Sequence, residues 1–309
     1  MILRAALVAL AWPAAAAAGD IAFVTAQTAG EVAVVDLDTG TIRTTVNVGG
    51  APAPVAYDAS AGQAHVISAE TGEMTTLDAR GRILGRVDLG EGAFGVAVDG
   101  AGQGLFVTDW YGARLRHLTL AGQERWTVPT GKAPAGVAVS GDGRIVATAD
   151  RDDDRLSGYD AGTGRRLWQA ATGRHPYAVA FHDGRFWTTD VQSDSVTVIA
   201  AGTGAVLGRV PTGSHPYGIA FAAGKGFVTD QYAATVTVFD PATLSPLGTI
   251  EIGDYPEGIA ALSDGRRLAV ASWDSDELSV IDGDSQTILR VIPVPGGPRS
   301  FGLFVGPDS

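Results

Sequence analysis

One glycine-led pattern recurs seven times along the chain, and it limits the possible folds more than any other feature. Its copies read GGAPAPVAYD, GEGAFGVAVD, GKAPAGVAVS, GRHPYAVAFH, GSHPYGIAFA, GDYPEGIAAL and GGPRSFGLFVG. They stand about 40 residues apart, a period typical of repeat architectures in which each unit packs on its neighbours. The chain is therefore expected to be built from similar supersecondary units.

The stretches between these copies have the pattern of β-strands. Short runs such as AFVTA, LFVTD, FWTTD and GFVTD are followed by alternating runs such as EVAVVD, SVTVIA and TVTVFD. Valine, isoleucine, threonine and aromatic residues at period two, bounded by Gly, Asp and Asn, indicate strands joined by tight turns. Four strands in each repeat of about 40 residues predict an all-β, seven-bladed β-propeller with four-stranded blades.

The order of the runs predicts how the ring closes. The repeats begin at a second-strand sequence, IAFVTA, and end on a lone first-strand sequence, SFGLFVG at residues 300–306. We expect this last strand to join the sheet formed by residues 21–48 and to bury Phe301, Leu303 and Val305.

The innermost strands alternate large and small residues. In GSHPYGIAFA, Tyr217, Ile219 and Phe221 alternate with Gly218 and Ala220. Strand side chains point to opposite faces in turn, so the bulky face of one blade is expected to pack on the thin face of the next.

The first residues have the pattern of a secretory signal. Arg4 precedes a short apolar run, and AAAAAG then offers small residues for cleavage after Ala18. The apolar run is far shorter than the ~20 residues of a membrane span, and no later segment is long enough. We expect residues 1–18 to be a signal peptide, residues 19–309 to form one propeller domain, and the protein to be periplasmic or secreted without a membrane span.

Composition excludes several classes of function. The chain has no cysteine and two methionines, so disulfides, thiolate metal sites and covalently attached c-type haem are ruled out. Its formal net charge is −12, whereas nucleic-acid binders need a basic surface to neutralise phosphates. We expect no nucleic-acid partner.

The FVTA and FVTD runs, each followed by a loop and a V-x-V strand, resemble the YVTN-type β-propeller repeat family over residues 21–306. The chain departs from that pattern by using Phe for Tyr and by ending these runs in Asp or a small residue instead of Asn. The resemblance implies an exported seven-bladed ring. It also associates the chain, through the fold alone, with haem-handling proteins and with propellers linked to quinone-dependent dehydrogenases.

Two copies of the repeat carry His-Pro-Tyr, which gives the candidate binding site. The loops before the innermost strands share one rim, so His175 and His215 are expected at equivalent places on adjacent blades. Alignment of the copies puts Tyr255 and Arg299 at the same position as these histidines, and Ala or Gly in the other three blades. Tyr177, Tyr217 and Glu257 occupy the position two residues later. This one-sided distribution points to ligand contact, although both tyrosines and both histidines also suit a structural role.

The same rim is expected to receive Asp190 and Asp230, which end two T-D strands. With His175 and His215 they would form a set of ligands for a divalent metal. The alternative is that these aspartates cap the turns that follow them.

The leading interpretation is a monomeric, non-catalytic binding or scaffold protein that takes a small molecule or a partner protein on this rim. No catalytic residue is assigned and the cofactor is unknown, with a divalent metal or haem as the candidates. Two alternatives stay open. One is a metal-dependent enzyme similar to propeller lactonases or streptogramin-type lyases. The other is a haem- or cofactor-handling accessory protein with His175 or His215 as the axial ligand.

Overall fold

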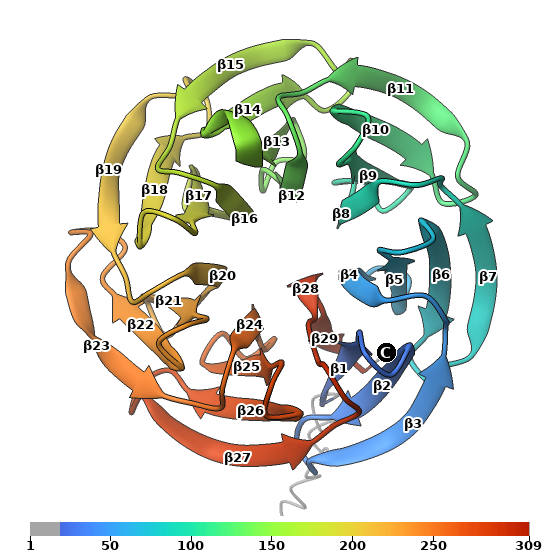
Figure 1. Cartoon of the computed structure of the whole chain (residues 1–309), viewed down its shortest axis with the longest axis vertical. Coiled ribbons are helices and arrows are strands. Elements are labelled where there is room, and N and C mark those ends of the chain that lie inside the picture. The colour runs from blue at the N-terminus through green and yellow to red at the C-terminus, as the bar shows by residue number, and fades with distance from the viewer. Residues whose placement is uncertain (1–18, 309) are drawn as a thin grey trace, which may run out of the picture.

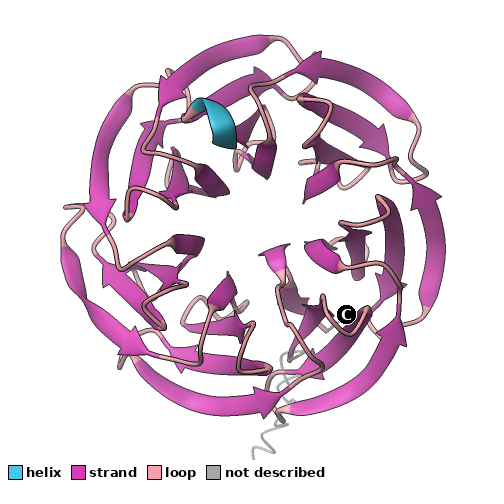
Figure 2. Ribbon diagram, in the orientation of Figure 1, coloured by secondary structure: helices cyan, strands magenta, loops and turns pink. Residues whose placement is uncertain are grey.

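The computed structural model describes residues 19–308 and arranges them as seven sheets around a central axis (Figure 1). The predicted signal segment, residues 1–18, lies outside the described residues. Strands make up nearly all of the ring, and η1 (Arg151–Asp153) is the only helix within residues 19–308 (Figure 2). None of the helical structure in that range is long and apolar enough to span a membrane. The predicted seven-bladed propeller is confirmed.

Each blade is a sheet of four antiparallel strands that run outward from the axis in chain order, except in blade 1, where the innermost strand is the C-terminal β29. Blade 1 holds β1 (Asp20–Ala26), β2 (Glu31–Asp36), β3 (Thr41–Asn47) and β29 (Val305–Pro307). Blade 2 holds β4 (Pro52–Asp58), β5 (Gln63–Ser68), β6 (Glu73–Asp78) and β7 (Ile83–Asp88). Blade 3 holds β8 (Ala93–Val98), β9 (Gly104–Asp109), β10 (Arg114–Thr119) and β11 (Glu124–Pro129).

The remaining four blades repeat this order. Blade 4 holds β12 (Pro134–Val139), β13 (Ile145–Asp150), β14 (Arg155–Asp160) and β15 (Arg166–Ala171). Blade 5 holds β16 (Pro176–His182), β17 (Arg185–Asp190), β18 (Ser195–Ala200) and β19 (Val206–Pro211). Blade 6 holds β20 (Pro216–Ala222), β21 (Lys225–Asp230), β22 (Thr235–Phe239) and β23 (Pro246–Glu251). Blade 7 holds β24 (Pro256–Ala261), β25 (Arg267–Ser272), β26 (Glu277–Asp282) and β27 (Thr287–Pro293).

The C-terminal residues close the ring, as predicted, but in two pieces instead of one strand. β29 pairs antiparallel with β1, so that the red end of the chain meets the blue start (Figure 1). The preceding β28 (Phe301–Leu303) pairs parallel with β4 of blade 2. The two strands are separated by Phe304, and Gly302 inside β28 has a φ of +112°, a conformation that favours glycine.

This division into two strands corrects the predicted burial of the tail. Phe301 and Val305 are buried as expected, whereas Leu303 is 53% exposed and Phe304 is fully buried in its place. In a single straight strand, Phe301, Leu303 and Val305 would all face the same side. The break after β28 instead buries Phe304 and leaves Leu303 exposed.

The inner strands carry a bulge near their start, which corrects the expected alternation of side chains. In β16 the pairing with β17 shifts register between Pro176 and Val179. Tyr177 therefore turns to the axis, where its ring lies 6.1 Å from that of Phe94 in a blade that is not its neighbour. Val179 packs beside the cluster that contains Phe186 and lies between blades 4 and 5.

A threonine in the second strand links neighbouring blades. Thr189 accepts a hydrogen bond from the Ala178 N–H of its own blade and donates its hydroxyl to the Tyr217 carbonyl of the next blade. The inner strands approach so closely that a Cβ on Gly218 would collide with the carbonyl oxygen of Glu257. The small residues that the sequence places in these strands therefore allow the blades to meet near the axis.

Candidate functional site

Seven residues surround the axis on the rim that carries His175 and His215, here called the His rim. Six lie near the start of the inner strands β4, β8, β12, β16, β20 and β24, and the seventh lies just before β28. They are Ala53, Phe94, Ala135, Tyr177, Tyr217, Glu257 and Arg299, here called the axial ring. Their equivalence follows from two sets of bonds to one threonine position. The N–H after the ring residue donates to it in four blades: Gly95 to Thr108, Ala178 to Thr189, Gly218 to Thr229 and Ser300 to Thr25. The same threonines, in the preceding blade, donate to the carbonyls of Ala53, Ala135, Tyr217 and Glu257.

This equivalence corrects the predicted position of Arg299. Aligned with His175 in the sequence, Arg299 instead shares the position of Tyr177 and Tyr217. The residue equivalent to His215 is Gly297, since Gln27 bonds its carbonyl just as Gln231 bonds that of His215. Alignment on Pro298 instead of on the preceding glycines would have found this match.

The axial ring divides into two arcs. The polar arc is Tyr177, Tyr217, Glu257 and Arg299, in consecutive blades. The apolar arc is Ala53, Phe94 and Ala135. The structure therefore brings together four of the predicted site residues, which lie up to 122 positions apart in the chain (299 − 177).

The members of the polar arc form one hydrogen-bonded network. Arg299 Nε lies 2.6 Å from Glu257 Oε2, and Arg299 Nη2 donates to Tyr217 Oη at 2.5 Å. Tyr217 Oη donates in turn to Tyr177 Oη at 2.8 Å. Two glutamines complete the network, since Gln231 donates to Glu257 Oε1 at 2.6 Å and Arg299 Nη1 donates to Gln27 Oε1 at 3.0 Å.

Burial dominates the ionisation of this network. It raises the pKa of Glu257 to about 7, although the nearby Arg299 charge opposes the shift. Burial also raises the pKa of Tyr177 and of Tyr217. Although burial opposes it, the attraction of Tyr217 and Glu257 raises the pKa of Arg299. The arginine therefore stays charged, and it holds a carboxyl group in a place with little access to water.

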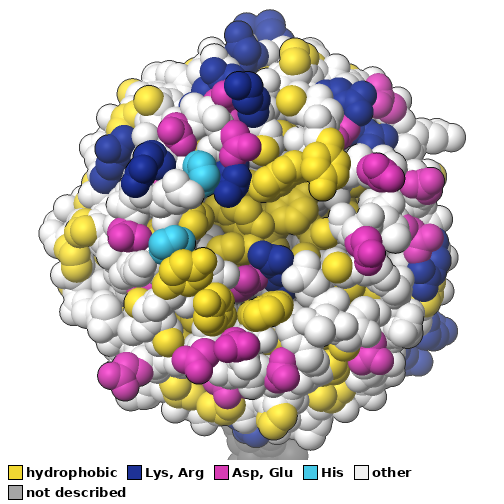
Figure 3. Space-filling model, in the orientation of Figure 1, with side chains coloured by type: hydrophobic (Ala, Val, Ile, Leu, Met, Phe, Trp, Pro, Cys, Tyr) yellow, Lys and Arg dark blue, Asp and Glu magenta, His cyan; other side chains and the backbone are white. Residues whose placement is uncertain are grey.

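Aromatic rings close the axis beneath the His rim. The Phe301 ring lies 4.9 Å from Tyr177 and 5.4 Å from Phe94, and the Phe94 ring lies 5.4 Å from Trp110. These contacts join blades on opposite sides of the ring. Figure 3, which looks onto the His rim, shows a central hollow floored by apolar side chains, with Lys or Arg and His side chains at its margin.

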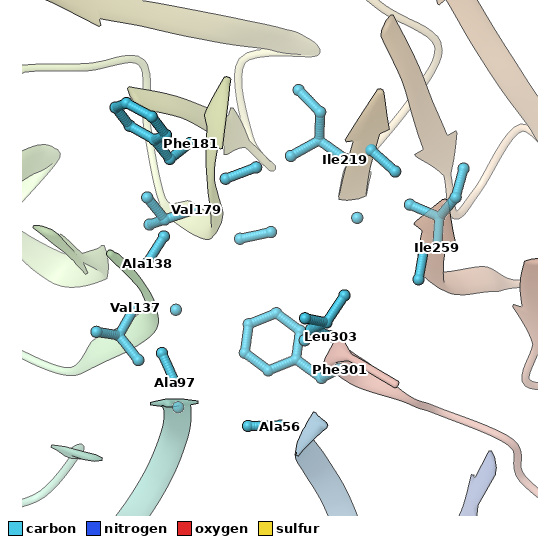
Figure 4. Close-up of a pocket in the computed structure, with 18 of the residues that line it drawn as sticks. Ala56, Ala97, Val137, Ala138, Val179, Phe181, Ile219, Ile259, Phe301 and Leu303 are labelled. Atoms are coloured by element: carbon cyan, nitrogen blue, oxygen red, sulfur yellow. The ribbon is translucent and has the colours of Figure 1, made fainter. Parts of the chain in front are cut away.

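Beneath this closure lies a cavity of about 560 Å³. Its wall is mostly apolar, and Figure 4 shows the Phe301 ring near its centre. Representative lining residues are Val96, Val137, Val179, Ile219 and Ile259. Glu257 also reaches this wall, so the polar arc lies between the hollow and the cavity.

The two histidines lie at equivalent loop positions, as predicted, and both have left-handed backbones. Their φ angles are +53° for His175 and +57° for His215. The backbone N–H of each donates to an aspartate of the preceding blade, Asp154 for His175 and Asp194 for His215. These bonds hold the loops in place through the backbone of each histidine and do not involve the imidazole rings.

The surroundings of the two imidazoles differ. His215 stacks on Tyr232 with ring centroids 3.9 Å apart, and its Nδ1 lies 3.0 Å from the Ser214 hydroxyl. His175 Nδ1 is buried and has no hydrogen-bond partner among the described residues. No hydrogen bond or ring contact joins the two imidazoles within residues 19–308.

Tyr255 extends the aromatic surface beyond the histidines. It lies 5.5 Å from the Tyr232 ring and 6.3 Å from the Trp273 ring. Tyr232 is 58% exposed and Tyr255 is 39% exposed. The rim over blades 6 and 7 therefore offers a row of accessible rings at the edge of the polar arc.

The two aspartates proposed as metal ligands point into their own blades. Asp190 Oδ2 accepts hydrogen bonds from the hydroxyls of Ser195 and Thr197. Asp230 Oδ2 accepts them from Thr235 and Thr237. Burial raises the pKa of each carboxyl to about 6, and the hydroxyls oppose this shift.

Within residues 19–308 the structure contains no group of three or more His, Asp or Glu side chains placed to hold a metal ion. It does not gather Asp190 and Asp230 with His175 and His215 into one centre. The reason is that hydroxyl groups on the neighbouring strands β18 and β22 already donate hydrogen bonds to the two carboxylates. Asp109, in contrast, caps the turn that follows it, because its carboxylate accepts the Gly112 N–H at 2.6 Å.

Sequence reasoning missed Gln27, Gln231 and Trp110 as members of the site. All three directly follow the second strand of a blade, in TAQ, TDQ and TDW. Alignment of that column would have revealed a second set of varied side chains on the His rim.

The comparisons with known proteins support the propeller fold. The family described as outer membrane protein assembly factor BamB matches residues 70–189, which is less than half of the chain. A search of the curated proteins finds no match.

Several solved structures share the fold at low sequence identity. A functionally unknown protein from Desulfotomaculum acetoxidans has a TM-score of 0.77 and 14% identity, covering 90% of this chain and 97% of its own. A hydrazine synthase from Kuenenia stuttgartiensis has a TM-score of 0.72 and 16% identity, covering 81% of this chain and 88% of its own. A streptogramin B lyase has a TM-score of 0.67 and 17% identity, covering 79% and 83%. These structures show the β-propeller fold, and the similarity to the BamB family extends over residues 70–189. None of these matches tests the resemblance to the YVTN type.

Proposed function

We propose that the protein is a non-catalytic propeller that binds a small molecule in the hollow of the His rim. The observation that carries this proposal is the polar arc, in which Tyr177, Tyr217 and Arg299 are joined by hydrogen bonds around the axis on this rim. The repeat itself does not need these side chains, because Thr25 and Thr108 link blades through the carbonyls of Ala53 and Ala135 in the apolar arc as well.

The proposed site also includes the rim residues around this hollow. His175 and His215 stand at its margin, and Tyr255 and Glu257 belong to blade 7 beside them. An apolar hollow with a few convergent polar groups is the usual form of a small-molecule site. The proposal further takes the protein to be exported, on the pattern of residues 1–18, and monomeric.

The test is a thermal-shift screen of the mature protein against divalent ions, haem and small organic acids, bases and alcohols. A ligand at a hundredfold excess over its Kd stabilises the folded state by about 2.7 kcal/mol. We expect the shift given by any hit to shrink in His175→Ala/His215→Ala. The matched control is His182→Ala, which changes a histidine at the far end of β16. A hit whose shift survives the double variant and vanishes in His182→Ala would contradict the proposal.

A further inference from the structure

The hydrogen bonds of the polar arc run in one direction. A guanidinium has only donors, so the Arg299 Nη2–H must be given to Tyr217 Oη. Tyr217 then gives its own hydrogen to Tyr177 Oη. Tyr177 Oη is therefore an acceptor in this series of hydrogen bonds, and its own O–H can donate to a further group.

Within residues 19–308 no acceptor receives the Tyr177 O–H. The residue is only 8% exposed, so this hydroxyl hydrogen is a largely buried donor. Leaving such a donor unpaired is unfavourable, and buried polar groups in native proteins nearly always have a partner. The missing acceptor is therefore an atom from outside the described chain.

The charges around Tyr177 favour an anionic acceptor. A donor chain headed by a cation is polarised along its length, which strengthens the last O–H as a donor. Arg299 and Arg151 both act on the Tyr177 hydroxyl as positive charges, while Glu257 opposes them. Hydrogen bonds to ionised acceptors are about twice as strong as neutral ones.

The rings around Tyr177 favour a flat apolar body for the same ligand. Phe94 and Trp110 form an edge-to-face pair on the side of the apolar arc, and the Arg151 guanidinium lies 5.5 Å from the centre of the Trp110 ring. Trp110 and Phe94 are both partly exposed. Aromatic rings pack favourably in offset or edge-on contacts with such surfaces.

We propose, on the basis of the rim site described above, that its ligand is an aromatic carboxylate. One carboxylate oxygen accepts the Tyr177 O–H, and the aromatic body packs against Phe94 and Trp110. The ligand thus completes the donor chain that starts at Arg299.

The test uses two matched probes, 1-naphthoate and 1-naphthalenemethanol, which differ in the carboxylate alone. Titration calorimetry at pH 7.5 with the whole mature protein is expected to show naphthoate binding at least tenfold more tightly than the alcohol. Tyr177→Phe removes one hydroxyl and is expected to weaken naphthoate about tenfold. It should weaken the alcohol less, because a neutral oxygen accepts a weaker hydrogen bond than a carboxylate. Quenching of Trp110 fluorescence, absent in Trp110→Phe, places the probe in the hollow.

Tyr232→Phe is the matched control, because it removes an exposed hydroxyl from the same rim. Thermal melts of each variant verify that it folds. Equal binding of the acid and the alcohol, with Tyr177→Phe unaffected, overturns the carboxylate assignment. If His175→Ala/His215→Ala still weakens both probes in that case, the rim site itself stands. Failure of naphthoate to bind at its solubility limit also overturns the assignment, with water then as the acceptor of Tyr177, while the thermal-shift screen decides the rim site separately.

Discussion

The two arcs of the axial ring share one backbone and differ in their side chains. In both, a threonine of the preceding blade bonds the carbonyl of a ring residue, as Thr108 does for Ala135 and Thr229 does for Glu257. The side chains of the apolar arc, two alanines and one phenylalanine, add no polar group to this arrangement. The polar arc adds a buried ion pair and two linked hydroxyls to the same positions.

This difference separates architecture from function. Ala53 and Ala135 show that a propeller inner strand is complete with a methyl group at the axial position. A buried ion pair is in general no more stabilising than well-packed apolar side chains. The polar arc therefore adds chemistry that the ring does not require, and the following changes test that conclusion.

The largest effect is expected from removing the tail that supplies Arg299 to the polar arc. A chain ending at Pro298 loses the buried side chains of Phe301, Phe304 and Val305. At about 1.5–3 kcal/mol each, this loss of about 5–9 kcal/mol rivals the whole stability of a typical domain. We expect the truncated protein to be unfolded by circular dichroism.

Leu303→Ser is the control for this truncation, since an exposed side chain should change stability by less than about 0.5 kcal/mol. A truncated chain that melts within a few degrees of the parent would show that the tail does not close the ring.

A smaller loss is expected from Arg299→Met, which leaves Glu257 buried without its partner. Removing one member of a buried ion pair costs about 3–5 kcal/mol. Burial raises the pKa of Glu257 above its unfolded value, so the protonated form stabilises the fold at low pH and this contribution is lost as pH rises. Urea unfolding at pH 5 and pH 8 should show a larger deficit at pH 8.

Two further variants sharpen this measurement. Adding Glu257→Gln to Arg299→Met should recover most of the deficit at pH 8, because no buried charge is left. Gln27→Ala removes only the neutral partner of Arg299 and should cost about 0.5–1.5 kcal/mol at either pH. Equal deficits at the two pH values would mean that Glu257 is not the group left unpaired.

Asp190 and Asp230 predict a further pH effect in the blades that carry His-Pro-Tyr. Their pKa values are raised to about 6, so the stability that their protonation gives is present below about pH 4 and is lost by about pH 6 to 7. Each contributes about 1–3 kcal/mol, at 1.4 kcal/mol for each pKa unit. Asp190→Asn/Asp230→Asn should flatten this fall in chemical unfolding between pH 4 and 7. Parallel curves for parent and variant would contradict the buried setting of these carboxyls.

The smallest effect is expected at the histidines. Both have left-handed backbones, which cost residues other than glycine roughly 1–2 kcal/mol, whereas the greater freedom of glycine in the unfolded chain costs about 0.4–1 kcal/mol. His175→Gly and His215→Gly should therefore each stabilise by about 0.5–1 kcal/mol, or about 2 °C in melting temperature. Ala133→Gly, at the same loop position in blade 4 with φ +48°, should behave alike. A loss of more than about 1 kcal/mol confined to the histidine variants would assign the imidazoles a structural role.

Much of the architecture could be predicted from local patterns. Seven glycine-led copies, with strand-forming runs between them, repeat similar strand and turn preferences along the chain, so the count of blades and the closure by the tail followed. Residue-level detail at irregular points did not. Leu303 was expected to be buried because alternation was extended through Gly302. Arg299 was placed two positions away because Gly297 was matched to Gly213, whereas Gly297 corresponds to His215 and Pro295 stands in place of the glycine.

The sequence by itself determined the ring, since each repeat encodes its strands locally and can bury its faces only against a copy of itself. It also brought His175, His215, Tyr177 and Tyr217 to notice by their repetition. Only the tertiary structure decided that Arg299 reaches across the closure to Glu257 and Tyr217, and that Tyr177 ends the chain of donors. Contacts of this kind depend on a bulge, a break in the tail strand and the direction of single hydrogen bonds, none of which local residue preferences specify.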